Sequence, residues 1–320
     1  MDKISITSHF FKNSKIYIYV TYTINMVNLR IKEVNGKKYY YLEHTMREGN
    51  RFRNKRKYLG SEVPKNVELI KARFMHGLFL EKYRKSLETI KKKFSEDFSK
   101  YPPSAKEQYI ESFMIKFTYN TNRIEGSTLS LKETADLLQQ HITPRNKPIE
   151  DVKEAEAHKK VFYEMLEYKK DLRLSEVLHW HKLLLQDTKT DIAGIIRMHQ
   201  VAIARSKAEL PFPAELDTLL HEFFIWYNKN KEKLTPVVLA ALVHLKFVTI
   251  HPFSDGNGRI SRLMMNFVLH KHNYPMLSTE YTNRNSYYNA LERSQTKNKE
   301  YIFVQYLVKR YLKMYKKYLK

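Results

Sequence analysis

Residues 251–262 combine the side chains that a nucleotide phosphate site needs. The segment reads His-Pro-Phe-Ser-Asp-Gly-Asn-Gly-Arg-Ile-Ser-Arg, so an imidazole, a carboxylate, two glycines and two arginines fall close together. An imidazole can accept a proton near neutral pH, a carboxylate can bind a divalent cation, and guanidinium groups bind phosphate oxygens. The chain has only eight glycines in 320 residues. Two of them around a single Asn therefore indicate a loop whose backbone approaches a ligand closely.

A helix is expected to begin close to Gly258 and to present this loop. The apolar residues that follow have the i, i+3, i+4, i+7, i+8 spacing of one buried helix face. They are Ile260, Leu263, Met264, Phe267 and Val268. The unpaired N–H groups of the first turn and the positive end of the helix dipole favour phosphate oxygens there. Before the loop, Pro236 to Ile250 is apolar nearly all round, which predicts a buried central helix that holds His251 on rigid support.

The same residues resemble the signature of the Fic (filamentation induced by cAMP) family, His-x-Phe-x-Asp/Glu-Gly-Asn-Gly-Arg-x-x-Arg, at every specified position. The resemblance implies an enzyme that binds ATP with Mg²⁺ or Mn²⁺ and transfers AMP to a Ser, Thr or Tyr hydroxyl of a protein. It implies that His251 is the general base and Asp255 the metal ligand. The phosphate-binding residues that it implies are Gly256, Asn257, Gly258, Arg259 and Arg262. Relatives that phosphorylate carry Lys at the position of Gly258, so the resemblance favours nucleotidyl transfer.

A second resemblance concerns a flap. Ala193 to Arg197 resembles the Gly-x-x-Arg segment of the family that leads into its flap. Val201 to Pro213 resembles the flap itself, a hairpin that aligns the target chain by strand pairing, with Val201 and Ile203 as the aligning residues.

Downstream of the signature, Tyr287 and Tyr288 fall in a region that resembles the border of the nucleotide base. The alternative is that this aromatic pair belongs to the core. His244 also matches a family position, but its apolar surroundings predict a core histidine.

The segment Thr121-Asn-Arg-Ile-Glu-Gly126 predicts an inhibitory element. A capping box at Ser104 to Glu107 and the apolar residues after it indicate a helix that runs to about Ile124. Glu125 would lie at its carbonyl end, where the dipole disfavours a carboxylate, with Gly126 as the cap. The segment resembles the inhibitory motif Ser/Thr-x-x-x-Glu-Gly/Asn of the family, which implies that Glu125 pairs with Arg262 and prevents productive ATP binding. Some relatives use this Glu to remove AMP, and the sequence leaves the direction open.

The rest of the chain predicts a mainly α protein in which a Fic-type helical domain with a small β-hairpin flap follows a small β-meander and a helix. Further helices are expected at 130–138, 149–170, 174–186, 215–228 and 285–295. We expect the catalytic domain, with its inhibitory helix, to span residues 101–295. Residues 296–320 are expected to form a basic amphipathic helix that packs on the core or, alternatively, lies on a membrane surface.

Residues 1–100 are expected to form a basic β/helical region. Val27 to Leu59 alternates apolar and polar residues with turns at Asn35-Gly36 and Glu48-Gly-Asn50, and a helical stretch follows to Phe98. Met26 is an alternative start. The region contributes to a net charge of +23 for the whole chain. A basic hairpin with tyrosines is compatible with a nucleic-acid partner or an acidic protein target, and the lysine-rich composition can also serve solubility alone.

The composition of the chain excludes several kinds of functional site. The absence of cysteine excludes disulfides, Cys-ligated zinc and thiol catalysis. The apolar run Ile16 to Val20 is too short to span a bilayer and no signal peptide is evident, so a cytoplasmic location is expected. The family resemblance implies a homodimer. The competing functions are AMP removal, transfer from another nucleotide donor, and a nucleic-acid-associated regulator that senses a nucleotide.

Overall fold

The computed structural model describes residues 5–6, 20–24, 27–48, 51–203 and 206–320. They divide into two compact units, Met1–Tyr83 and Arg84–Lys320. The division falls inside helix α1 (Val67–Ser99), whereas the sequence predicted a boundary at residue 100. The helical pattern continues through residue 84 without a break in composition, so the sequence carries no signal for this boundary.

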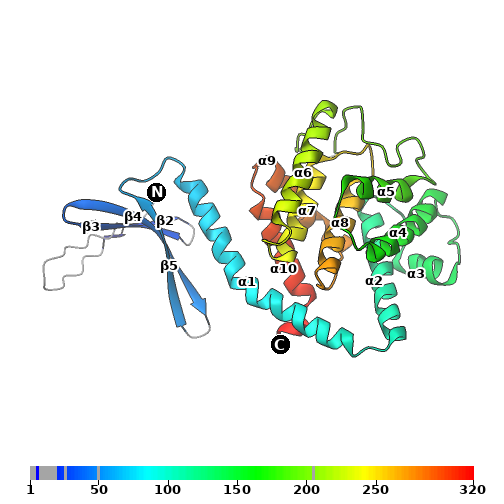
Figure 1. The fold of residues 1–320 in the computed structure, drawn as a ribbon, viewed down its shortest axis with the longest axis horizontal. Coiled ribbons are helices and arrows are strands. Elements are labelled where there is room, and N and C mark those ends of the chain that lie inside the picture. Colours follow the sequence, from blue (N-terminus) through cyan, green and yellow to red (C-terminus); the bar gives the residue numbers. More distant parts are fainter. Residues whose placement is uncertain (1–4, 7–19, 25–26, 49–50, 204–205) are drawn as a thin grey trace. The chain divides into compact units, whose positions relative to one another are not determined.

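The first unit is built on an antiparallel sheet with strand order β1-β2-β3-β4-β5 (Figure 1). Its strands are β1 (Ser5–Ile6), β2 (Val20–Ile24), β3 (Val27–Val34), β4 (Lys37–Glu48) and β5 (Arg51–Gly60). Strands β3 to β5 confirm the predicted meander. Asn35 and Gly36 both have positive φ, 52° and 72°, as a two-residue type I′ hairpin requires. Met26 and the tip of the second predicted turn, residues 49–50, lie outside the described residues.

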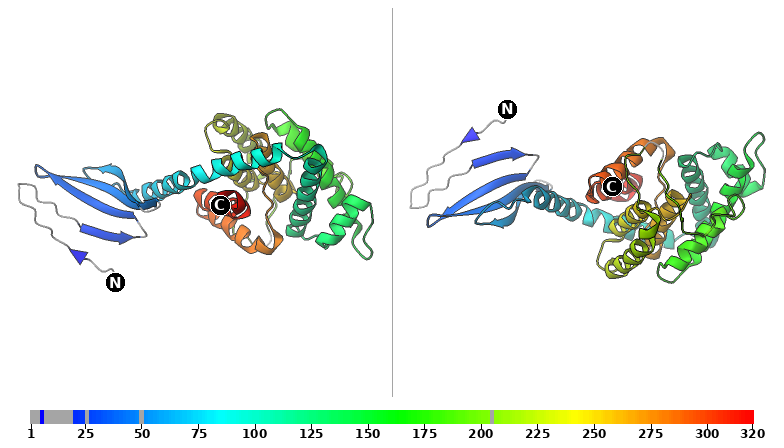
Figure 2. Two further views of the ribbon diagram at one scale, coloured as in Figure 1. Left: turned by 90° about the horizontal axis from the view of Figure 1, so that it is seen from below. Right: turned by 90° about the horizontal axis from the view of Figure 1, so that it is seen from above.

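The second unit is helical, as predicted (Figures 1 and 2). Its helices are α2 (Pro103–Ile124), α3 (Leu131–Gln140), α4 (Ile149–Glu167), α5 (Leu174–Leu185), α6 (Leu216–Asn230), α7 (Pro236–Ile250), α8 (Asn257–Lys271), α9 (Arg284–Thr296) and α10 (Tyr301–Met314). Short 3-10 turns lie at Pro213–Glu215, Tyr281–Asn283 and Lys316–Leu319. Helices α7 and α8 form the centre: α6 and α10 pack on α7, and α2, α4 and α5 pack on α8.

The burial of α7 and α8 follows from their sequences. The predicted apolar face of α8 is at most 1% exposed, and α7 is buried on nearly all sides. The apolar residues of α10, including Phe303 and Leu307, are buried where α10 packs on α7 and α9. The C-terminal segment therefore contains the expected helix, which packs on the core. Within the described part of the chain, no helix is both long and apolar enough to cross a membrane.

Two local predictions need correction. Helix α2 begins at Pro103, and Ser104 lies inside its first turn without the predicted capping box, because proline suits the first helical position. The flap is not a hairpin in its described residues: 201–203 and 206–212 carry no strand, although Ser206 N–H donates to the Ile203 carbonyl at 3.1 Å. An isolated two-stranded ribbon is marginally stable, and the residues Ala202, Lys207 and Ala208 have low strand propensity.

Candidate functional site

The predicted ion pair between Glu125 and Arg262 is present. Glu125 is the C-cap residue of α2, and its Oε1 lies 2.6 Å from Nη2 of Arg262 on α8. The Arg262 side chain is 1% exposed and the Glu125 side chain 31% exposed. Gly126 has φ 111°, a conformation that glycine adopts without strain, so the chain can turn away directly after Glu125. The pair therefore joins the end of one helix to the start of another.

Gly258 makes room for this pair. A Cβ atom at position 258 would overlap Oε1 of Glu125 and would lie 3.1 Å from Nη1 of Arg262. The carboxylate thus lies against the first turn of α8, where the N–H groups of Asn257, Gly258 and Arg259 have no partner within the helix. This is the position at which a helix favours an anion. Glu125 occupies part of the predicted phosphate site.

Arg262 is held by neutral groups as well as by Glu125. Its Nε donates to Oγ1 of Thr121 at 2.6 Å and its Nη2 to the Thr121 carbonyl at 3.2 Å. Its Nη1 donates to the hydroxyl of Tyr287 at 3.3 Å, and that hydroxyl bonds Nε2 of His244 at 2.8 Å. Burial alone would lower the pKa of Arg262, but Tyr287 and Glu125 reverse this and raise it. The guanidinium group is therefore charged and fixed in one orientation.

His251 has the geometry of a general base. It ends α7 with φ 52° and ψ 56°, a left-handed conformation that is costly for a residue with a side chain. Its Nδ1 bonds the Val248 carbonyl at 3.1 Å, which places the proton on Nδ1 and leaves Nε2 as the basic nitrogen. Arg197, 3% exposed, stabilises this turn: its Nε donates to the His251 carbonyl at 2.9 Å. The same guanidinium group also donates to the carbonyls of His199 and Pro211, at either end of the flap.

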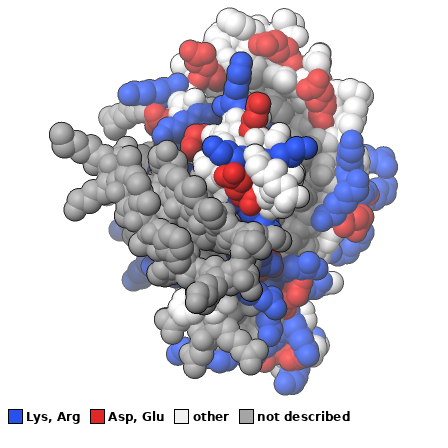
Figure 3. Space-filling model, turned by 90° about the vertical axis from the view of Figure 1, so that its left-hand side faces the viewer, with Lys and Arg blue, Asp and Glu red and all other residues white. Residues whose placement is uncertain are grey.

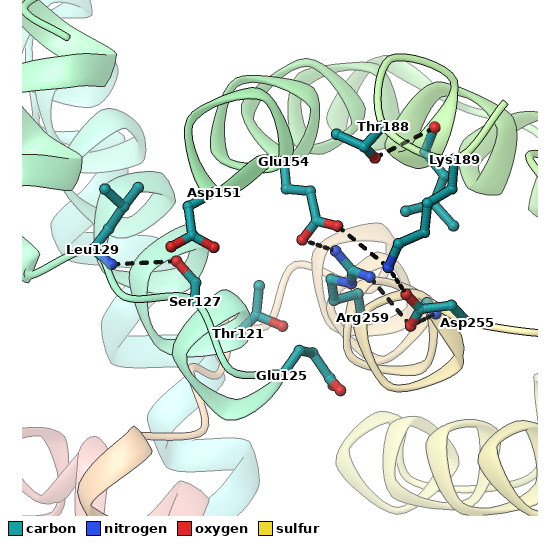
Figure 4. Close-up of polar contacts among 12 residues, drawn as sticks. Thr121, Glu125, Ser127, Leu129, Asp151, Glu154, Thr188, Lys189, Asp255 and Arg259 are labelled. Carbon is teal, nitrogen blue, oxygen red and sulfur yellow. Dashed lines mark hydrogen bonds and ion pairs between the residues drawn. The ribbon is translucent and has the colours of Figure 1, made fainter. Parts of the chain in front are cut away.

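Four charged side chains form a network beside the loop (Figure 4). Arg259 donates to Glu154 of α4 at 2.5 Å and lies 3.4 Å from Oδ1 of Asp255. Lys189, from the segment after α5, pairs with Oδ2 of Asp255 and lies 3.8 Å from Glu154. Burial opposes ionisation of Asp255, but Arg259 and Lys189 outweigh it and lower its pKa to about 2. Arg259 is only 2% exposed and its Nη1 is bound to Glu154, so its predicted contact with phosphate stays a prediction.

Asn257 and His181 fix the shape of the loop. The Asn257 side chain accepts from Phe253 N–H at 2.9 Å and donates to its carbonyl at 2.7 Å, so only its backbone is available to an anion. His181 of α5 stacks on the ring of Phe253 with centroids 3.7 Å apart. Its Nδ1 accepts from Gly194 N–H and its Nε2 bonds the Asp255 carbonyl at 3.0 Å. Burial lowers the pKa of His181 to about 4, so it is neutral and joins two segments of the site.

A cavity of about 850 Å³ opens onto these residues. It brings together most of the residues predicted from the sequence, namely Glu125, Ile203, His251, Asp255, Gly258, Arg262, Tyr287 and Tyr288. Tyr287 is 2% exposed and its hydroxyl is engaged by Arg262, so it positions the arginine instead of offering its face to a base. Tyr288 is 43% exposed and donates to the Ile124 carbonyl at 2.8 Å. The structure thus separates the two tyrosines into a buried residue and an accessible one.

The sequence analysis missed Glu154, Lys189, His181 and the role of Arg197. Each contacts the loop from a segment at least 54 residues away in the chain. The one available signal was the first arginine of the signature, Arg259, because a buried guanidinium requires a carboxylate partner. That requirement does not identify which acid supplies it.

Comparison with known proteins agrees with this geometry. Residues 171–269 match the Fic/DOC family. The chain is 34% identical over 192 residues to the protein adenylyltransferase Fic of Aedes aegypti. The aligned residues cover 58% of this chain and 37% of that protein. It is 31% identical over 190 residues to the protein of the same name from Nematostella vectensis, covering 58% and 44% of the two chains. The match spans less than half the length of these relatives.

Solved structures show the same fold. The Fic domain containing signaling protein of Bacteroides thetaiotaomicron superposes with a TM-score of 0.65 at 29% identity, covering 72% of this chain and 96% of that one. Fic-1 from C. elegans superposes with a TM-score of 0.66 at 22% identity, covering 79% and 76%. At that identity the second similarity establishes the fold alone.

Proposed function

We propose that this chain, whose residues 171–269 match the Fic/DOC family, is a protein adenylyltransferase that transfers AMP from ATP to a Ser, Thr or Tyr hydroxyl of a protein. The observation that carries the proposal is the position of His251 Nε2, Asp255 and the first turn of α8 around one cavity. This arrangement joins a base to an anion site, as nucleotidyl transfer requires.

In the proposed step, the first-turn N–H groups of α8 and Arg262 hold the phosphates of ATP. Nε2 of His251 takes the proton of the attacking hydroxyl, and the hydroxyl oxygen forms a bond to the α-phosphorus. The bond from the α-phosphorus to the bridging oxygen breaks, and pyrophosphate leaves. Arg197 contributes by holding the backbone of His251 in its left-handed conformation.

The site suits a divalent cation of the Mg²⁺ or Mn²⁺ kind. The described residues contain no cluster of three His, Cys, Asp or Glu side chains that could hold a metal alone. Mg²⁺ commonly uses one or two carboxylates with substrate phosphates. Asp255 offers such a carboxylate, and its ion pair with the ammonium group of Lys189 supports a cation at this position. The ion would neutralise phosphate charge when bound, with Asp255 as its protein ligand.

The ion pair supports autoinhibition by Glu125. Arg262 cannot bind a phosphate while Glu125 holds it, and the carboxylate repels phosphate oxygens at the start of α8. Thr121 belongs to this element because it binds the same arginine. Tyr288 belongs to it as well, because its hydroxyl fixes the last carbonyl of α2.

The flap and the partners of the enzyme extend the proposal. Ala202, Ile203 and Ser206 line the cavity, so a protein segment that carries the hydroxyl would pass along the flap. We propose that it pairs with the backbone near Val201 and Ile203, as a strand added to the flap. The homodimer and the cytoplasmic location stay predictions.

We expect Lys189→Met to bind Mn²⁺ about two- to fivefold more tightly, since its ion pair with Asp255 is partly exposed and contributes at most about 1 kcal/mol. The paramagnetic resonance signal of free Mn²⁺ measures this without any reaction. Lys153→Met, which removes a nearby charge on α4 that contacts only the Asp187 carbonyl, is the matched control. Unchanged or weaker binding by Lys189→Met would show that Lys189 does not compete for this position.

We expect the pH profile of kcat/KM to reflect a depressed pKa of His251. Burial lowers that pKa below the usual 6.5, while the Val248 carbonyl and Glu125 oppose the shift. The imidazole must be neutral to act as a base, so transfer by Glu125→Gly should stay constant above pH 6.5 and fall on the acid side with a midpoint below 6.5. Loss of Glu125 moves the midpoint further down. A midpoint at or above 7 contradicts this assignment.

The function is tested by incubating the protein with nucleoside triphosphates that carry label on the α-phosphorus, and following label on protein. We expect ATP to be the best donor and γ-labelled ATP to give none. For AMP removal, protein first modified by Glu125→Gly is incubated with the unchanged chain. Release of the label there, with no incorporation by the unchanged chain itself, would assign the alternative function.

A further inference from the structure

The first unit presents one open face, defined here as the β3–β5 side chains that point away from α1. On the opposite face Leu42 and Met46 are buried, and Lys55 forms an ion pair with Glu81 of α1 at 2.5 Å. Strand alternation and the register then assign the open face to Asn28, Arg30, Lys32, Lys37, Tyr39, Tyr41, Glu43, Thr45, Phe52, Asn54, Arg56 and Tyr58. The contacts across it agree: Thr45 bonds Asn54 at 2.7 Å, and the rings of Tyr41 and Tyr58 lie 5.2 Å apart.

The charge exposed on the open face is positive. Its one acid among the described side chains, Glu43, is 8% exposed and is bound by Arg30 at 3.1 Å and by Arg56 at 2.5 Å. Arg56 has a side chain that is 64% exposed in spite of this pair, and Lys32 and Lys37 are exposed. The face therefore neutralises its acid internally and still offers cations to a partner.

Exposed aromatic rings lie among these cations. Phe52 is 72% exposed and Tyr58 is 53% exposed, on the same edge strand as Asn54 and Arg56. Aromatic rings exposed on a strand can stack on the flat faces of a ligand. Basic side chains are spread widely over the described surface (Figure 3), so charge alone does not single out this face. The exposed rings between the cations distinguish this face from the rest of the basic surface.

We propose that the open face binds single-stranded nucleic acid, with its cations on the phosphates and the rings of Phe52 and Tyr58 stacked on bases. An acidic protein would also satisfy the charge, and competition by polyglutamate distinguishes the two partners. A DNA duplex does not fit this face for two reasons. Its bases are stacked on one another, so their flat faces are not accessible to protein rings. Its major groove, about 12 Å wide, admits a two-stranded ribbon, whereas this face spans three strands. A single strand, whose unpaired bases can stack on aromatic residues and whose phosphates can bind basic residues of an open sheet, fits both the exposed rings and the exposed cations. The proposal does not depend on the AMP-transfer activity.

Fluorescence anisotropy of the full chain with a labelled single-stranded oligonucleotide, and with the duplex of the same sequence, tests the proposal. We expect the single strand to bind more tightly than the duplex. Phe52→Ala with Tyr58→Ala should weaken its binding by at least about tenfold. The matched control is Tyr101→Ala with Phe212→Ala, which removes two exposed rings outside the sheet. Lys32→Gln with Lys37→Gln should reduce the slope of log affinity against log salt by about 1.4.

Three results would overturn the proposal. These are tighter binding of the duplex, equal binding by the Phe52 and Tyr58 variant when circular dichroism shows it folded, and equal competition by polyglutamate. Phe52→Trp, which keeps a ring at this position, should retain binding. A failure here leaves label transfer from ATP unaffected, so the two proposals are separable.

Discussion

Replacing Glu125 by Gly is expected to raise the rate of AMP transfer on the order of 10²-fold, comparable to the effect of one charge-stabilising donor in an active site. The change removes the carboxylate from the first turn of α8 and releases Nη2 of Arg262, which is 2.6 Å from Oε1 in the paired state. Thr121 and Tyr287 still orient the arginine, so it is ready to bind a phosphate. Initial rates of label incorporation from α-labelled ATP measure the effect.

The same variant should respond differently to ATP in the absence of any protein target. Its buried arginine has lost its anionic partner, so the melting temperature should fall and ATP should restore more of it than in the unchanged chain. Glu167→Gly, an exposed acid at the end of α4, is the matched control. Equal rates for Glu125→Gly and its parent at saturating ATP would refute autoinhibition by this residue.

Replacing His251 by Ala in the Glu125→Gly background is expected to reduce transfer by roughly 10²- to 10⁴-fold, the usual effect of losing a general base. Nε2 of His251 faces the cavity as the unprotonated nitrogen because Nδ1 bonds the Val248 carbonyl. The phosphate contacts come from α8, so the double variant should keep the ATP-induced rise in melting temperature. If it modifies protein as fast as its parent, His251 is not the base.

The parts of the site that could be predicted from the sequence are those whose residues are contiguous in the chain. Residues 251–262 lie within a single loop and helix start, so type and spacing sufficed to place a base, a carboxylate and an anion site there. The burial of α7 and the apolar face of α8 followed from periodicity alone. The pairing of Glu125 with Arg262 joins residues 137 positions apart, and it came from a family motif, not from local pattern.

The parts that the sequence did not reveal depend on tertiary packing. Glu154 faces Arg259 because α4 packs on α8, and Lys189 reaches Asp255 because the segment after α5 crosses the loop. In the sequence both are ordinary charged residues of a lysine-rich chain. Tyr287 matched an expected base-binding region, yet burial turned it into a support for Arg262. The prolines at 102 and 103 let α2 begin before the capping box that its residues suggested, so Ser104 lies inside the first turn.

The central claim is that a nucleotidyl transfer site lies at the start of α8 and is held closed by Glu125. The most direct measurement is label transfer to protein from ATP labelled at the α or at the γ phosphorus, with the unchanged chain, Glu125→Gly, and Glu125→Gly with His251→Ala. The account predicts α label alone, strongest for Glu125→Gly and lost in the double variant. Label from the γ position, or no α label with any variant, would contradict it.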